Sequence, residues 1–192
     1  MIDSPQRLVF PVRTREDYAY LPISFVDTDV VLGDDMLAVP GAGPYMFGVL
    51  SSSVHRAWAD TVGTFEDGML VYDPSMVYNN CPWPETDGVP VLREAVEKTA
   101  DGILLAREAH PDLALDKLYD EATMPDELRA AHEKNDAAVL AAYGLPPSAS
   151  DMDILSLLFT RYAELVGKDP TESLRWLEAH RPFRRRPIRR RH

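Results

Sequence analysis

The chain has 192 residues, of which 45% are hydrophobic and 27% are charged. This length suits one large domain or two small ones, and the composition is that of a globular protein, which excludes disordered and collagen-like chains. No apolar run reaches the roughly 18 residues of a membrane-spanning helix, and residues 1–10 lack the basic-then-apolar order of a signal peptide. The single cysteine, Cys81, cannot form an internal disulfide. We therefore expect a cytoplasmic protein with no membrane partner.

The charge is unevenly distributed along the chain. There are 31 Asp and Glu residues against 20 Lys and Arg, for a net charge of −11, yet residues 181–192 contain seven arginines and no acid. The acidic remainder argues against non-specific nucleic-acid binding by residues 1–180. We expect the tail arginines, among them Arg184, Arg185 and Arg186, to pair with carboxylates of the body or of a second copy, or else with DNA phosphate.

Residues 18–84 are short apolar runs separated by Gly, Pro and Asp, a pattern typical of β-strands joined by tight turns. The predicted strands are 20–26, 36–39, 45–50, 69–72 and 76–78, with turns at 33–35, 41–44 and 66–68. The segment 52–62 is instead predicted to be a short helix that Ser52 or Ser53 would cap.

After Pro84 the apolar period changes from 2 to about 3.6 residues, which predicts helices. The first carries an apolar stripe over 92–104 and ends before Pro111, because a residue that precedes proline avoids the α region. The second opens at a capping box in 123–126 and ends at Gly144; the third runs from about Ser150 to Gly167, and a short fourth begins at 169–170.

These patterns together predict an α+β protein in three parts. Residues 1–84 form a strand-rich half with one short helix, 85–180 an all-α helical domain and 181–192 a basic tail. We expect Leu155, Phe159, Tyr162 and Leu165 of the third helix to be buried, with the first three facing the strand-rich half. Asn135 falls on the apolar stripe of its helix, where we expect a buried amide that neighbouring backbone satisfies.

The residues that could carry catalysis do not form a recognised arrangement. Ser51–Ser53 lie close to His55, but the glycine-flanked turn of a serine hydrolase is missing. The glycines at 41 and 43 lack the third glycine of a dinucleotide-binding loop, and the five histidines and Cys81 have no metal-ligand spacing. We therefore expect no catalytic residue and no metal in this chain.

The segment Asn80-Cys81-Pro82-Trp83 partly resembles the Asn-Pro-Pro-aromatic loop with which amino-DNA methyltransferases hold a flipped base. Cys81 replaces the first proline, however, and the 79 residues before Asn80 contain no glycine-rich loop for S-adenosylmethionine. A strand end followed by a rigid turn is the ordinary interpretation of this segment.

Four segments in order resemble the C-terminal part of MmeI-like, type IIL restriction-modification enzymes. These are single chains with endonuclease, adenine methyltransferase, target recognition and C-terminal helical regions. The matching segments are 20–25, 45–58, 77–84 and 118–144. The resemblance implies that residues up to about 84 are the distal part of a target recognition domain, and that the rest is the helical domain packed on it.

The resemblance also implies what this chain lacks. The methyltransferase motifs and nuclease carboxylates of such an enzyme lie upstream, so the chain would be non-catalytic by itself and would bind no cofactor, S-adenosylmethionine belonging to the parent enzyme. It would be a fragment, a separately encoded subunit or a gene remnant. Its partner would be double-stranded DNA, which it would bind together with an upstream methyltransferase region or subunit.

One departure from the family concerns the segment 63–75. In the family this segment is basic and rich in tyrosine, and the resemblance implies contact with DNA; here it has three acids and no Lys or Arg. The counterion release that supplies most non-specific affinity is therefore missing from it. The alternative function is an acidic interaction or assembly module that no longer binds DNA; a free-standing small methyltransferase is a weaker third.

The candidate DNA contacts come from the matching region and from the tail. They are Ser52, His55, Arg56, Tyr72, Ser75, Asn79, Asn80, Arg184, Arg185 and Arg186. Arg56 is expected to be an exposed cation that meets phosphate, or an exposed arginine without a partner. Asn79 and Asn80 would read an adenine edge, or would cap a strand end.

Overall fold

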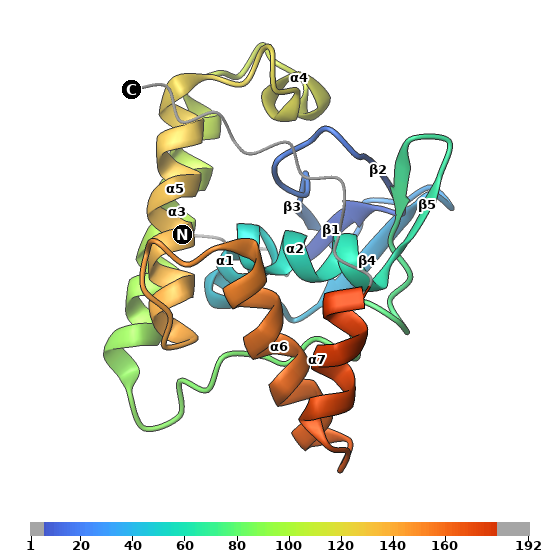
Figure 1. Ribbon diagram of the computed structural model, residues 1–192. Helices are drawn as coiled ribbons and strands as arrows, with labels where there is room; N and C mark the ends of the chain where they lie inside the picture. The colour runs from blue at the N-terminus through green and yellow to red at the C-terminus, as the bar shows by residue number, and fades with distance from the viewer. Residues whose placement is uncertain (1–5, 180–192) are drawn as a thin grey trace.

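Two small antiparallel sheets form the scaffold of the N-terminal half (Figure 1). The computed structural model describes residues 6–179. In the first sheet, Gln6–Pro11 (β1) is the central strand, with Ser24–Asp27 (β3) on one side and Met36–Pro40 (β4) on the other. The strands predicted at 20–26 and 36–39 thus exist, although the first is shorter than expected.

The second sheet has Met69–Val71 (β6) between Arg13–Arg15 (β2) and Thr64–Glu66 (β5). Only one residue separates β1 from β2, so the chain passes directly from the first sheet into the second. The turn predicted at 66–68 closes the β5–β6 hairpin. Asp67 and Gly68 have φ values of 50° and 77°, as both central residues of a two-residue type I′ turn require.

Two of the predicted strands are wrong. The apolar run 45–50 belongs to the helix Pro44–Leu50 (α1), whose last four residues are all buried. A helix buried on every side shows no helical period, and Pro44 suits a helix start. The run 76–78 is part of a turn. The short helix predicted over 52–62 is confirmed as Ser53–Val62 (α2), with Ser52 Oγ accepting the amide of His55 at 3.2 Å.

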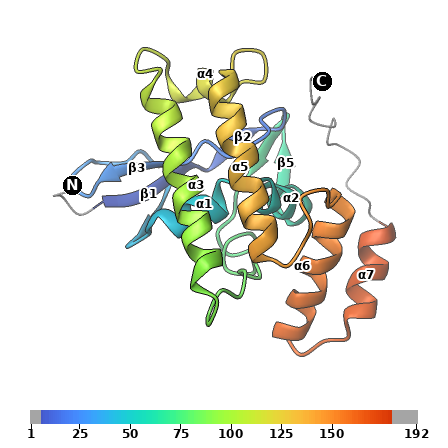
Figure 2. The same cartoon turned by 90° about the vertical axis from the view of Figure 1, so that its left-hand side faces the viewer.

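Helices make up the C-terminal half, which confirms the α+β fold class. They are Pro90–Glu108 (α3), Leu115–Tyr119 (α4), Asp126–Ala142 (α5), Asp151–Leu165 (α6) and Pro170–Ala179 (α7). Figure 2 shows α3 and α5 side by side, and α6 and α7 as a helical hairpin beside them. Within residues 6–179 no helix combines the length and apolarity that crossing a bilayer requires.

The helix α5 begins two residues later than predicted, and its predicted capping box is absent. The cap position is Pro125, which has no capping side chain, because the hydroxyl of Thr123 donates instead to the Lys117 carbonyl at 2.6 Å. A capping box does occur at the start of α6, where Ser150 and Asp153 satisfy each other's backbone amides.

A single hydrophobic core runs through both halves of the chain. Trp58 of α2 contacts Phe159 and Tyr162 of α6, so α6 faces the strand-rich half as predicted. Leu155 and Phe159 are buried and Tyr162 is partly buried. Leu165, expected in the same stripe, is 73% exposed because it is the last residue of the helix.

Two polar residues of α5 bind the N-terminal half directly. Asn135 is fully buried and donates to the Gly48 carbonyl of α1 at 2.8 Å, as the sequence predicts for this amide. The carboxylate of Asp136 accepts the Ser53 amide at the start of α2 (2.7 Å) and the Tyr20 hydroxyl (3.0 Å). The helical half therefore supplies hydrogen-bond partners for both helices of the other half.

Candidate nucleic-acid interface

Four of the predicted DNA contacts lie in the core. Ser52, His55, Arg56 and Tyr72 are each at most 1% exposed. Ser52 caps α2, where the sequence predicts Ser52 or Ser53 as the cap. None of the four side chains reaches the surface, so the α2 helix does not present them to DNA in this structure.

His55 joins three segments of the N-terminal half. Its Nε2 lies 2.9 Å from the Tyr72 hydroxyl, and its Nδ1 lies 3.5 Å from Cys81 Sγ. Burial lowers the pKa of His55 to about 3 and raises the pKa of Cys81 to about 12. At neutral pH the imidazole is therefore uncharged and the sulfur is a thiol, so this arrangement is no activated nucleophile. The two contacts hold residues 72 and 81 against α2.

The expected exposure of Arg56 is wrong. Its Nε pairs with Asp60 at 2.8 Å, and its guanidinium also reaches the Glu16 carbonyl at 3.4 Å. The strand β2 and the residues after it, which the sequence patterns did not reveal, cover this side of α2. The position of a residue on a short helix does not show which side of that helix another segment of the chain will cover.

The remaining three candidates of this half lie on the turn 73–80. Ser75 and Asn79 are exposed, and Asn80 is partly exposed. Asp73 Oδ1 accepts both the amide (2.8 Å) and the hydroxyl (2.6 Å) of Ser75, and these bonds lower the pKa of Asp73. The Asn80 amide donates to the carbonyls of Ser75 (2.7 Å) and Met76 (3.2 Å). Asn80 thus holds the turn together and leaves Asn79 directed to the surface.

The exposed face of the second sheet carries two arginines that the sequence analysis missed. Thr14 is buried, so its neighbours Arg13 and Arg15 point to the opposite, solvent-exposed side. Their side chains are 50% and 48% exposed. Arg13 forms an ion pair with Glu66 of the β5–β6 hairpin. The alternation basic-Thr-basic in 13–15 was the signal that could have found this face.

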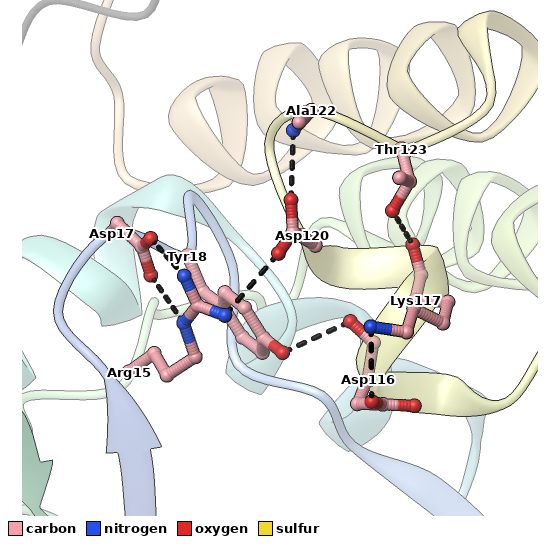
Figure 3. A network of polar contacts seen from close by, with 8 residues as sticks. All are labelled: Arg15, Asp17, Tyr18, Asp116, Lys117, Asp120, Ala122 and Thr123. Atoms are coloured by element: carbon pink, nitrogen blue, oxygen red, sulfur yellow. Dashed lines mark hydrogen bonds and ion pairs between the residues drawn. The ribbon is translucent and has the colours of Figure 1, made fainter.

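Arg15 also connects the two halves of the chain. Figure 3 shows its guanidinium between Asp17 and Asp120, the latter at 3.2 Å, where α4 ends. The Tyr18 hydroxyl donates to the Asp116 carbonyl of α4 at 2.9 Å. Arg15 lowers the pKa of Asp17 by its hydrogen bond and its charge, which favours the ionised carboxylate. The polar network fixes α4 onto the edge of the second sheet.

The tail residues Arg184, Arg185 and Arg186 lie outside the described residues. Within residues 6–179 no group of three His, Cys, Asp or Glu side chains could hold a metal ion. The arginines of β2, the hairpin β5–β6 and the turn 73–80 are therefore the described surfaces that we consider as a nucleic-acid interface.

Two family models match the chain. The model of the MmeI target recognition domain matches residues 2–85, and that of the MmeI C-terminal domain matches residues 89–168. The chain is also 31% identical over 163 residues to DNA methyltransferase A of Bacillus subtilis (strain 168), an alignment that covers 84% of this chain and 18% of that protein.

A solved structure gives the same result at the level of the fold. The type IIL restriction-modification enzyme MmeI, solved in complex with DNA, is similar to this chain with a TM-score of 0.78 and 35% identity. The similarity covers 86% of this chain and 22% of that one, so the chain spans about a fifth of each of these relatives. The chain belongs to the MmeI family of restriction-modification DNA methyltransferases, of which it carries the target recognition domain and the C-terminal domain.

Proposed function

We propose that this chain recognises a DNA sequence for a restriction-modification methyltransferase and is non-catalytic by itself. The observation that carries the proposal is the similarity to MmeI, because it extends across both domains and the solved relative is a DNA complex. The partners we propose are double-stranded DNA and a methyltransferase region, in the same polypeptide or in a separate one.

The exposed face of the second sheet supports this proposal with suitable chemistry. Arg13 and Arg15 lie on one face of β2, and both are about half exposed in their ion pairs. Exposed ion pairs of this kind contribute at most about 1 kcal/mol. Phosphate oxygens can therefore replace Glu66 as the partner of Arg13, and Asp17 and Asp120 as the partners of Arg15, at little cost.

The test is the salt dependence of binding to random-sequence duplex DNA, since the target sequence is unknown. In the full chain, Arg13→Gln with Arg15→Gln should reduce the slope of log affinity against log salt by about 0.9 for each lost phosphate contact. Arg93→Gln is the matched control. Arg93 is also an exposed arginine paired with a carboxylate, Glu97, but its helix α3 lies on the opposite side of the molecule from β2 and β5 (Figures 1 and 2).

An unchanged slope in the double variant, or an equal change in the Arg93 control, would contradict the role of this face. Thermal unfolding of each variant shows whether a change in affinity reflects a loss of fold. If the wild-type chain binds no duplex DNA at low salt, the proposal of DNA recognition by this chain alone fails. The acidic assembly module is then the better interpretation.

The proposal that the chain is non-catalytic has a separate test. The amide of Asn80 donates to two backbone carbonyls of its own turn, and Cys81 next to it is buried. A loop for holding a flipped base presents its amide and its backbone outwards. We expect no heat of binding when S-adenosylmethionine is titrated into the full chain, and micromolar binding would overturn this part of the proposal.

A further inference from the structure

A pocket of about 270 Å³ lies where the two halves meet, between α2, the turn 73–80 and the α6–α7 hairpin. Aromatic rings form much of its wall. They belong to Trp58, Phe159, Tyr162 and Trp176. The rings of Phe159 and Trp176 are stacked with centroids 5.7 Å apart. At the surface the wall is completed by Met76 (51% exposed) and Trp176 (43% exposed), so two large apolar side chains meet solvent at this pocket.

The lining specifies the chemistry of an occupant. Among the described residues that line it, none carries a charge; the polar groups are those of Thr61, Asn80, Tyr162 and the tryptophans. A buried guanidinium or carboxylate would have no ion partner there, which is unfavourable. An aromatic or aliphatic side chain matches the wall, and the volume is sufficient, because a cavity of about 150 Å³ already binds benzene.

We propose that this pocket is the docking site of the chain's own C-terminal segment, with Phe183 as the side chain that enters it. The argument is the place where the described chain ends. Trp176 lies in the last turn of α7, and Ala179 follows three residues later. Phe183 is four residues beyond Ala179, a reach of about 13 Å when extended. In residues 180–192 the large apolar side chains are Phe183 and Ile188, and Phe183 is the nearer to the pocket along the chain.

The docking has a consequence for the arginines that follow. Arg184, Arg185 and Arg186 come directly after Phe183, so they would be held at the rim that Met76 and Asn80 of the turn 73–80 help to form. A segment that repels itself by its charge would thereby be anchored through one ring. This inference does not depend on the proposed DNA recognition, because it concerns contacts within one chain.

The decisive experiment is disulfide trapping in the full chain. Met76→Cys is combined with Arg184→Cys, which leaves the Phe183 ring in place, and the control combines Leu165→Cys with Arg184→Cys. Leu165 is 73% exposed at the end of α6. It lies more than one helical turn after Phe159, the residue on which Trp176 stacks, so it is an accessible position away from these two rings. We expect mild oxidation to cross-link the first pair within one chain at least about tenfold faster than the control. Equal rates, or cross-links only between chains, would overturn the proposal.

Tryptophan fluorescence provides a second test without new cysteines. Phe183→Ala in the full chain should move the emission to longer wavelength, because water replaces the ring beside Trp176, while Ile188→Ala should not. The shift should disappear in a Trp176→Phe background, which leaves Trp58 and Trp83 in place. Absence of a shift, or the same shift in that background, would contradict the docking of Phe183.

Discussion

Acid should destabilise this protein through two histidines that are buried without charge. His55 and His132 are at most 1% exposed, and burial lowers the pKa of His55 to about 3 and that of His132 well below its ordinary value. His132 lies 2.9 Å from the Tyr119 hydroxyl and stacks on Tyr20 with ring centroids 4.0 Å apart. The charge of Arg107 lowers the pKa of His132 further.

The direction and size of the effect follow from the unfolded chain. An unfolded histidine takes up a proton near pH 6.5, whereas these two folded ones do not, so stability is complete above pH 6.5 and falls as the pH drops towards their folded pKa values. Between pH 7.5 and pH 5.0 each histidine should remove about 2 kcal/mol of unfolding free energy, or about 4 kcal/mol together. Carboxylates with lowered pKa values, such as Asp17 and Asp73, lose their contribution only at lower pH.

Urea unfolding at pH 7.5 and pH 5.0, followed by circular dichroism, measures this difference. His55→Gln and His132→Gln should each reduce it by about 2 kcal/mol, and the double variant should remove most of it. The comparison uses the change between the two pH values within each variant, so a general loss of stability does not affect it. A wild-type difference below about 1 kcal/mol would refute the reasoning, as would variants that retain the full difference.

Three further changes test the packing by thermal or urea unfolding. Gly48→Ala should cost about 1–3 kcal/mol, since its Cβ would lie 2.7 Å from a side chain of α3; unaltered stability would show that α1 and α3 separate easily. Asp136→Ala removes the acceptor of the Ser53 amide and the Tyr20 hydroxyl and should cost about 1–3 kcal/mol of unfolding free energy. A loss of stability no larger than that caused by Tyr20→Phe would argue against the contact with the Ser53 amide. Phe159→Ala should cost about 3–5 kcal/mol, whereas a loss below about 1 kcal/mol would mean that the ring contributes little to the core.

The long helices could be predicted from the sequence because their apolar stripes repeat over several turns. The bounds of α3, α5 and α6 follow from Pro111, Gly144 and Ser150, which stop or start helices by local chemistry. By contrast, the last four residues of α1 are all buried, including those on the side that an ordinary surface helix exposes to solvent. The helix therefore has a continuous apolar run like that of a buried strand. A short strand such as β2 shows only one alternation, Arg13-Thr14-Arg15, which is too brief to establish a strand by itself.

The candidate site depended on tertiary covering, which local patterns do not contain. Arg56 is chemically suited to phosphate, yet the residues around Glu16 bury it. Arg15 was overlooked, yet it lies on an exposed face because Thr14 fills the core side of the same strand. Which arginine meets solvent is decided by segments distant in sequence, and the amino-acid type alone gives no information on it.

The hydrogen bonds from Asn135 and Asp136 to the helices α1 and α2 bear on how such enzymes can be recombined. A crossover between relatives near residue 87 would join one parent's α5 to the other parent's α1 and α2. A mismatch would leave the Gly48 carbonyl without its donor, or the Ser53 amide without its acceptor, inside the protein. Recombination should therefore give folded proteins when both domains come from the same parent. A library of chimeras with crossovers before β1 should yield more folded proteins than one with crossovers between Pro84 and α3.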